Sequence, residues 1–261
     1  MAYCRNREIR RKTLTQPKNP IVLIPARLAS TRLPGKPLAD IGGSPMIVHV
    51  WRRAMAAGIG PVAVAAAEPE IVAAVRDAGG RAVLTDPDLP SGSDRVFAAL
   101  RALDPEGRHD AVVNLQGDLP TIDSLSIQRC LAGLVNAAAD ISTIAARIET
   151  AEDVANPNIV KAIAPLGPDR EVAFARDFLR EVGPHHAPPH WHHIGVYAYR
   201  RPVLERFVSL PVSAREAARK LEQMRAMDND MRIVVVRVDT VPLGVDTPHE
   251  LEIARRMLRT S

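Results

Sequence analysis

The sequence has few aromatic residues and few cysteines, and both shortages narrow the classes of protein that it can encode. Phe, Trp and Tyr make up 3% of the 261 residues, so we expect no surface on which nucleic-acid bases stack. The two cysteines, Cys4 and Cys130, are too few for a disulfide framework, which predicts a reducing compartment, the cytoplasm. No apolar run approaches the roughly 18 residues that span a bilayer, so we expect no membrane insertion.

A strong global charge is also missing. Six of the 34 Lys and Arg residues lie within residues 1–20 beside a single Glu, so the rest of the chain has 28 basic and 29 acidic residues. That body lacks the basic field of a nucleic-acid-binding protein, and we expect no nucleic acid as a partner. We interpret residues 1–20 as a basic, disordered tail; an organelle address or a tether to an anionic surface is the alternative.

What the sequence does contain is a regular alternation of apolar and helical segments. Strands are expected at 21–24, 62–66, 81–84 and 111–115, and helices at 44–57, 69–78, 93–103 and 124–136. Strands that alternate with helices of ten to fifteen residues indicate βαβ crossovers and a mostly parallel sheet.

The alternation loosens after about residue 140. The period-two pattern of 141–148 is typical of a half-solvated strand. Further strands are expected at 160–163, 172–174, 194–199 and 232–238, and helices at 202–210, 214–227 and from 247 onward. We interpret residues 21–261 as a single three-layer αβα domain, Rossmann-like, with an inserted smaller β-rich lobe at about 150–210.

The loop after the first strand, at residues 25–43, is the first candidate site. Ligands of open α/β sheets bind beyond the carboxyl ends of the strands, which is where this loop lies. Arg27, Arg32 and Lys36 place three cations within ten residues, which favours an anionic ligand over a merely solvated basic loop. Pro37 replaces the hydroxyl residue of a P-loop, and no G-x-G-x-x-G is present, so P-loop NTPases and dehydrogenases are disfavoured.

This loop, IPARLASTRLPGK at 24–36, resembles the signature of the 3-deoxy-manno-octulosonate (Kdo) cytidylyltransferases, also called CMP-Kdo synthetases. Similar blocks follow in family order: PLADI at 37–41, PMIVHV at 45–50, SGSDR at 91–95, NLQGD at 114–118, NPN at 156–158, HIGVY at 193–197, LEQ at 221–223 and GVDTP at 244–248. The resemblance covers about residues 21–258 and implies the fold of the nucleotide-diphospho-sugar transferases.

The activity that the resemblance implies is transfer of CMP from CTP to the anomeric hydroxyl of Kdo. Pyrophosphate leaves, and the CMP-Kdo product serves lipopolysaccharide biosynthesis in the cytoplasm. The resemblance also implies a homodimer, joined through the inserted lobe. Such transfers depend on alignment and charge neutralisation, and need no protein nucleophile.

The resemblance further implies a Mg²⁺ ion held by Asp118 and Asp246, with Arg27 and Lys36 also catalytic. Mg²⁺ prefers hard oxygen ligands, often one or two carboxylates with phosphates and waters. Asp118 directly follows an apolar strand, so its carboxylate is expected at the carboxyl edge of the sheet. Spacing alone does not pair two residues 128 positions apart, and for each carboxylate the alternative is a cap of a helix or turn.

The substrate contacts implied by the resemblance fall into two groups. The nucleotide is expected on Arg27, Ser30, Arg32, Lys36, Ser93, Arg95 and Gln116, and the sugar acid on Arg176, His193, Tyr197, Glu222 and Gln223. His193 and Tyr197 lie four apart on one strand and therefore share a face. Adjacent helical residues diverge by ~100°, so the end of the helix at Glu222 and Gln223 has to face the pocket. Plain capping or structural roles are the alternatives for Ser93, Arg176, His193 and Glu222.

The chain departs from the family pattern in three places. Leu119 stands where the family usually has Glu, which removes a carboxylate beside the metal site. Arg176 lies in a stretch, AFAR, that matches the family only loosely. Five of the eight histidines lie at 185–193; a second metal site is conceivable there, but a surface loop is the favoured interpretation.

Two other functions stay open from the sequence. The first is a cytidylyltransferase for another acidic sugar, 8-amino-Kdo or a nonulosonate. The second, from a different class, is a catalytically reduced nucleotide-binding protein. Magnesium-dependent release of pyrophosphate distinguishes them, because a binding protein would retain CTP and release none.

Overall fold

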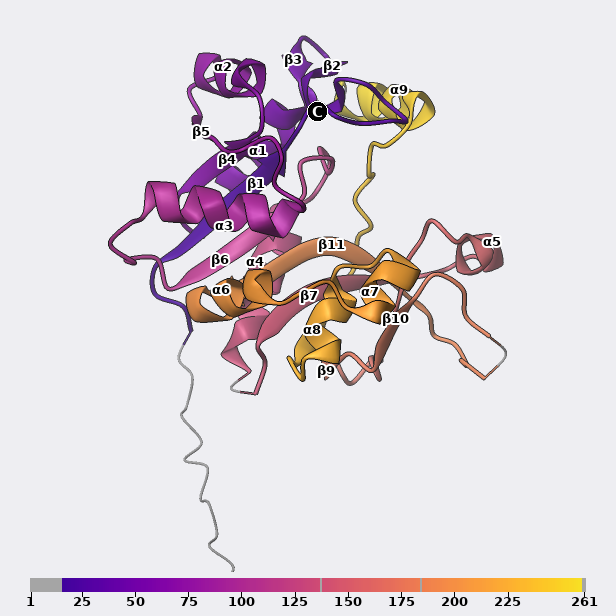
Figure 1. Cartoon of the computed structure of the whole chain (residues 1–261). Coiled ribbons are helices and arrows are strands. Elements are labelled where there is room, and N and C mark those ends of the chain that lie inside the picture. Colours follow the sequence, from indigo (N-terminus) through magenta and orange to yellow (C-terminus); the bar gives the residue numbers. More distant parts are fainter. Residues whose placement is uncertain (1–15, 137, 184, 260–261) are drawn as a thin grey trace, which may run out of the picture.

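A twisted sheet runs through the middle of the molecule and has helices on both faces (Figure 1). The structure is a computed structural model that describes residues 16–136, 138–183 and 185–259. Most of the expected basic tail, residues 1–15, lies outside the described residues. The main path of the sheet has the order β5-β4-β1-β6-β11-β7-β12-β9.

The first half of the chain builds the predicted βαβ units. Its elements are β1 (Pro20–Ala26), β4 (Val62–Ala66), β5 (Arg81–Leu84), β6 (Ala111–Leu115), α1 (Met46–Ala56), α2 (Pro69–Asp77), α3 (Gly92–Leu103) and α4 (Ser124–Ala132). All pairings among these four strands are parallel. Two helices differ in extent from prediction. The one expected at 44–57 begins at Met46, because β3 (Ser44–Pro45) pairs with β2 (Asp40–Ile41), and the one expected at 124–136 ends as an α-helix at Ala132.

The second half extends the same sheet. It contains η2 (Gly133–Val135), β7 (Ile141–Arg147), α5 (Ala151–Ala155), β8 (Lys161–Ile163), β9 (Val172–Phe174), β10 (Asp177–Leu179), β11 (Trp191–Arg200), α6 (Arg201–Ser209), α7 (Ala214–Arg219), α8 (Gln223–Asp228), β12 (Ile233–Val238) and α9 (Pro248–Leu258). β11 runs antiparallel between β6 and β7, while β12 is parallel to β7. Of the strands on the main path, all except β11 and β9 therefore point the same way, which confirms the mostly parallel sheet.

Two predicted elements of this half are corrected by the structure. The period-two strand is not half-solvated: in β7, Ser142 and Thr143 are fully buried, because a core packs on each face of the strand. Ile144 belongs to the cluster that contains residues of α4, and Ala145 to the one that contains residues of α8. The helix expected at 214–227 is two helices, because Lys220 adopts a left-handed conformation (φ 54°) that ends α7.

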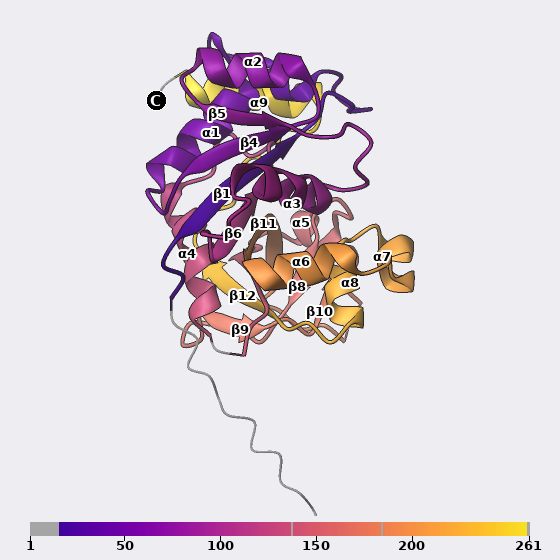
Figure 2. The same cartoon turned by 60° about the vertical axis from the view of Figure 1, so that its left-hand side comes forward.

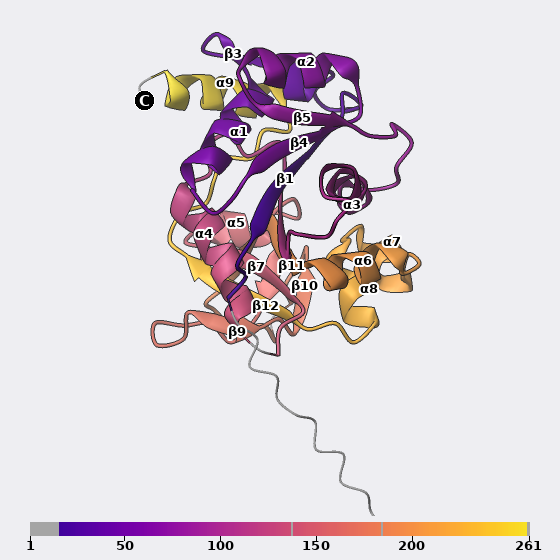
Figure 3. The ribbon, with the colours of Figure 1, turned by 90° about the vertical axis from the view of Figure 1, so that its left-hand side faces the viewer.

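The three predicted layers are visible edge-on in Figure 3, with α1 and α4 on one side of the sheet and α3 and α6 on the other. Alternate residues of the central strands pack toward opposite sides. In β1, Ile24 joins the core cluster that contains residues of α1, α2 and α4, and Leu23 joins the one that contains residues of α3, α6 and α8.

A third, smaller core fastens α9 onto the loop after β1. Leu251 and Ala254 of α9 pack with Leu33, Ile41 and Met46, and Val245, just ahead of the helix, is fully buried among them. α9 accordingly lies beside β2 and β3 at the top of Figure 1, and it is again at the top of the molecule in Figure 2. This contact joins the C-terminal segment to the first loop, where the sequence predicts the nucleotide.

The segment expected to form an inserted lobe adds short strands to the same sheet. β8 pairs with β10 and, through Lys161 and His192, with β11, while β9 pairs with β12 at the sheet edge. A separate lobe at 150–210 stays a prediction. Across the part of the chain that the structure describes, no helix is both long and apolar enough to cross a membrane.

Asp104 fastens the end of α3 to α6. Its carboxylate is 2% exposed, accepts the backbone N–H groups of Arg108 and His109 at 2.9 and 2.8 Å, and pairs with the Arg201 guanidinium. Burial opposes the charged form, but these hydrogen bonds outweigh it and lower the pKa of Asp104 to about 2. A carboxyl with a depressed pKa stabilises the fold above its ordinary pKa and loses that contribution as the pH falls toward 2.

We expect Asp104→Asn to lower the free energy of unfolding at pH 7 by about 3 kcal/mol, since it removes one partner of a buried ion pair. The difference from wild type should shrink as the pH falls from 4 to 2. Urea unfolding across this range measures both, with Asp169→Asn, an exposed carboxylate, as a control that changes little. A loss that is independent of pH would contradict this account.

Candidate active site

A pocket of about 330 Å³ opens at the carboxyl ends of β1 and β6, where the sequence places a ligand. Its walls come from the end of β1, the loop after it, the start of α3, the turn after β6 and the segment before α9. The lining residues are Pro25, Ala26, Arg27, Ala29, Ser30, Thr31, Arg32, Lys36, Pro37, Leu89, Ser91, Gly92, Arg95, Gln116, Gly117, Asp118 and Asp246. Of the twelve residues expected to bind nucleotide or sugar, the pocket gathers six: Arg27, Ser30, Arg32, Lys36, Arg95 and Gln116.

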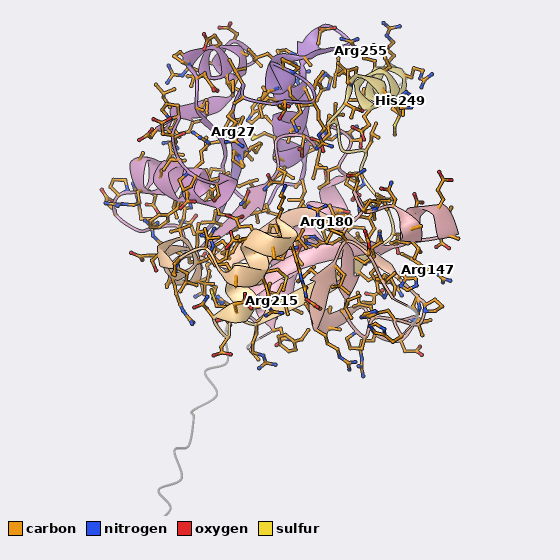
Figure 4. All side chains as sticks on the ribbon, turned by 45° about the vertical axis from the view of Figure 1, so that its right-hand side comes forward. Arg27, Arg147, Arg180, Arg215, His249 and Arg255 are labelled. Atoms are coloured by element: carbon orange, nitrogen blue, oxygen red, sulfur yellow. The ribbon has the colours of Figure 1, made fainter. Side chains whose placement is uncertain are left out.

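The loop after β1 owes its shape to a few backbone contacts. Glu68, just before α2, accepts the N–H of Leu28 at 2.9 Å. Gly35 adopts φ 68°, a conformation that favours glycine, and begins the short helix η1 (Lys36–Leu38). Arg27 follows β1 directly and lies in the upper half of Figure 4, above the labelled Arg180 and Arg215. The fold therefore presents the basic side chains of this loop to the pocket.

Lys36 lies between the two carboxylates that the sequence predicts as metal ligands. Its Nζ donates to Asp118 Oδ2 at 2.8 Å and to Asp246 Oδ1 at 2.9 Å, and Arg32 pairs with the other oxygen of Asp246 at 2.9 Å. The N–H of Val245 also donates to the carbonyl of Asp118 at 3.0 Å. One ammonium group thus touches side chains 128 positions apart in the sequence.

The pKa values in this cluster follow its charges. Burial works to lower the pKa of Lys36, but the charges and hydrogen bonds of Asp118 and Asp246 outweigh it and raise that pKa. Burial likewise works to raise the pKa of Asp246, and Lys36 and Arg32 reverse the effect and lower it. Both groups therefore stay charged at neutral pH.

The two carboxylates fit a divalent cation. They already share one positive group, the Lys36 ammonium, and they offer the hard oxygen atoms that Mg²⁺ prefers. Among the described residues, no group of three or more His, Cys, Asp or Glu side chains is arranged to hold a metal. An ion on Asp118 and Asp246 would therefore complete its coordination with phosphate oxygens and water, as Mg²⁺ usually does.

A chain of side-chain hydrogen bonds leads from the pocket toward α8. Gln116 donates to Asn114 at 3.2 Å, Asn114 to Ser93 at 3.4 Å, and Ser93 to Glu222 Oε2 at 2.8 Å. Glu222 immediately precedes α8, so the end of this helix, rather than its side, meets the start of α3. Burial raises the pKa of Glu222, although hydrogen bonds from Ser91 and Ser93 and the charge of Arg225 work against that rise.

The other residues predicted for the sugar lie on β11, at the start of α8 and between β9 and β10. The rings of His193 and Tyr197, on β11, lie 5.5 Å apart between centroids and are both largely buried. Gln223 is buried at the start of α8. Arg176 is exposed on the connection between β9 and β10 and is not part of the pocket wall, so the structure does not bring it together with the nucleotide residues.

Two residues singled out in the sequence, Arg95 and Leu119, make contacts within the protein that support its structure. The guanidinium of Arg95 is directed to the loop after β5, where it donates to Thr85 Oγ1 at 2.7 Å and to the carbonyls of Asp86 and Pro87. Leu119 is buried in the core beside the sheet, so a hydrocarbon side chain takes the place of the family's carboxylate.

Two polar residues of the strands were missed from the sequence, Asn114 and Thr143. Asn114 lies inside the NLQGD block, and its polarity within an otherwise apolar strand was a signal that it has a partner. Thr143 gave no such signal, because a polar residue in an alternating strand is equally typical of a solvated face.

Gly117 allows Asp118 to approach β1 closely. A Cβ at this position would lie 2.8 Å from the carbonyl oxygen of Pro25 and 3.3 Å from Ile47 Cδ1. Gly117→Ala should therefore displace the turn that holds Asp118 and weaken the binding of CTP, the nucleotide that the sequence predicts, by about tenfold or more. Calorimetric titration measures this, and Gly167→Ala, where a Cβ meets nothing within 4 Å, is the control. Equal affinities in the two variants would contradict the role of this close approach.

Comparison with known proteins identifies the family of the chain. The family described as cytidylyltransferase matches residues 21–233. The chain is 58% identical over 240 residues to the 3-deoxy-manno-octulosonate cytidylyltransferase of Paramagnetospirillum magneticum (92% of this chain, 98% of the relative). It is 60% identical over 240 residues to the protein of the same name from Rhodospirillum rubrum (92% and 95%).

Two solved structures are also similar to this chain. The structure of a CMP:2-keto-3-deoxy-manno-octonic acid synthetase complexed with CTP superposes with a TM-score of 0.83 at 36% identity, covering 93% of this chain and 99% of that one. A 4-diphosphocytidyl-2C-methyl-D-erythritol synthase from Anaerococcus prevotii shares the fold, with a TM-score of 0.61 at 12% identity, 93% of this chain and 99% of that one. The chain belongs to the cytidylyltransferase family and, within it, to the 3-deoxy-manno-octulosonate cytidylyltransferases.

Proposed function

We propose that this chain transfers CMP from CTP to the anomeric hydroxyl of 3-deoxy-D-manno-octulosonate, releasing pyrophosphate and giving CMP-Kdo for lipopolysaccharide biosynthesis. One observation carries the proposal: Asp118 and Asp246 share the Lys36 ammonium at the end of a pocket lined by Arg27 and Arg32. This arrangement suits a nucleoside triphosphate, because it combines cations for the phosphates with carboxylates for a divalent cation.

The basic side chains neutralise the triphosphate. Arg27 and Arg32 carry forked guanidinium groups, which match phosphate oxygens, and Lys36 adds a compact ammonium with three donors. Together they favour the additional negative charge that develops on the leaving pyrophosphate. These residues need to bind and orient the phosphates, and none has to form a covalent bond with them.

Asp118 and Asp246 are the residues that we propose to hold Mg²⁺. The bound ion would supply electrostatic activation, by neutralising charge on the triphosphate and polarising the α-phosphate. The positions of the two carboxylates would determine where the ion lies in the pocket. Asp118 is held by the turn after β6, and Asp246 by the backbone bond between Val245 and Asp118 and by the packing of Val245 and α9.

The sugar acid is proposed to lie beyond Gln116, along the hydrogen-bond chain that ends at Glu222. His193, Tyr197 and Gln223 are proposed to supply further polar groups to the sugar, and Arg176 is proposed as a partner for the sugar carboxylate. The incoming anomeric hydroxyl then approaches the α-phosphate from the side opposite the leaving pyrophosphate, as an in-line transfer requires. We also propose that the enzyme works in the cytoplasm as a homodimer joined through residues 150–210.

The reaction can be tested by crossing the four nucleoside triphosphates with Kdo, 8-amino-Kdo and a nonulosonate, with and without Mg²⁺. We expect pyrophosphate release with CTP, Kdo and Mg²⁺ together. Release with a different sugar acid would replace Kdo by that sugar. Binding of CTP with no release for any sugar would instead identify a nucleotide-binding protein.

Asp118→Ala and Asp246→Ala should each lower kcat by about a hundredfold or more, because each removes one of the two carboxylates proposed to hold the Mg²⁺ that neutralises the triphosphate. The circular-dichroism spectrum should stay that of wild type. Asp169→Ala, an exposed carboxylate elsewhere, is the matched control. Near wild-type turnover in either site variant would remove that residue from the proposed metal site.

A further inference from the structure

The side chain of Thr143, on β7, faces two backbone carbonyls and one imidazole nitrogen of β11. Its Oγ1 lies 2.7 Å from the carbonyl oxygen of Val196, 3.4 Å from that of Ile194 and 3.0 Å from Nε2 of His193. Thr143 is fully buried and His193 is 8% exposed. A shift in register between β7 and β11, between Ile194 and Tyr197, accompanies these contacts.

The single proton of the Thr143 hydroxyl decides the protonation of the imidazole. A carbonyl oxygen only accepts, so the 2.7 Å contact with Val196 requires the hydroxyl to donate there. If the hydroxyl donated to His193 instead, two oxygen lone pairs would face each other at that distance. The hydroxyl is therefore the acceptor toward His193, and Nε2 must carry the proton that it donates.

The other ring nitrogen is left as an acceptor. Burial lowers the pKa of His193 to about 3, with a smaller contribution from His192, so the ring is neutral and carries one proton, which is on Nε2. Within the described part of the chain, Nδ1 of His193 has no hydrogen-bond partner. Some polar atoms without a partner are fully buried, but Nδ1 is not among them. Nδ1 therefore offers a lone pair to solvent-accessible space.

We infer that Thr143 is a positioning residue that fixes His193 as the Nε2–H tautomer, so that Nδ1 accepts a hydrogen bond from a hydroxyl group of the sugar acid. The inference rests on the proposed function, since it takes His193 to face the sugar. A neutral acceptor nitrogen binds an O–H donor and not a carboxylate, which has only lone pairs to offer. His193 thus selects for a hydroxyl, and the sugar carboxylate has to be bound by another group.

The surroundings of His193 hold the ring in this orientation. Phe178 packs edge-on against it, with 4.8 Å between centroids at 64°, and Tyr197 lies 5.5 Å away. Tyr197 is close enough to Glu222 for the charge of that carboxylate to raise its pKa, after burial itself. His193 therefore belongs to the same group of side chains as the hydrogen-bond chain that leads to Gln116.

The tautomer can be measured on the intact protein without substrate. In enzyme labelled with ¹⁵N in histidine, long-range proton–nitrogen spectra at pH 7 should show His193 with a protonated Nε2 and an unprotonated Nδ1. The spectrum of His193→Gln assigns the signal among the eight histidines. A protonated Nδ1, or a doubly protonated ring, would overturn the inference.

Kinetics test the consequence for the sugar. Thr143→Val, which keeps the shape and removes the hydroxyl, should raise KM for the sugar acid about tenfold, the usual size of one lost hydrogen bond, and leave KM for CTP unchanged. Thr143→Ser restores the hydroxyl and should restore KM to within about twofold of wild type. Ser142→Ala removes the neighbouring buried hydroxyl from the same strand and should change neither constant.

The outcomes separate this inference from the proposed function. If no sugar acid supports pyrophosphate release, the proposed function fails, and with it the assignment of the Nδ1 acceptor to a sugar hydroxyl, while the tautomer set by Thr143 is still decided by the spectrum. If release occurs but Thr143→Val leaves the sugar KM unchanged or raises both KM values equally, the positioning role is wrong. A Thr143→Ser variant as impaired as Thr143→Val would also overturn it, because the hydroxyl would then not be the group that matters.

Discussion

The site depends on one electrostatic constraint: two carboxylates that face each other need a cation between them. In this structure the Lys36 ammonium satisfies both Asp118 and Asp246, with Arg32 supporting the second. Three local features hold the carboxylates there: the close approach of Gly117 to β1, the backbone bond from Val245 to Asp118, and the small core under α9. The loop, the sheet and the C-terminal helix thus meet at a single charged cluster.

The proposed sugar side of the site is organised by polar groups inside the sheet. Asn114 is the one polar residue of β6, and Thr143 follows Ser142 on β7; both are fully or almost fully buried. Each side chain forms hydrogen bonds with a neighbouring strand or helix, as buried polar groups require. Asn114 connects Gln116 to Ser93 and Glu222, while Thr143 holds His193. Gln116 of the pocket and His193, proposed for the sugar, are therefore both oriented from within the core.

Much of this could be predicted from the sequence, because local patterns are strong in the first half of the chain. The apolar runs, helix signals and basic loop predicted the βαβ units and the position of the pocket. Local patterns could not predict contacts between residues far apart in the sequence, and only the resemblance to a family paired Asp118 with Asp246. The same limit explains the error on β7, whose burial depends on the helices packed on both faces of the sheet. The break in the helix expected at 214–227 has a local cause, a left-handed Lys220, which is not a glycine and so gave no signal in the sequence.

The place of Asp246 in the chain has a consequence for biosynthesis. The residue lies just ahead of α9, whose packing onto the loop after β1 completes the charged cluster. During translation the sheet and both its helical layers emerge before this segment does. Asp246 and the small core that holds it are therefore synthesised after every other part of the pocket wall, so the charged cluster is complete only once the last helix has been made.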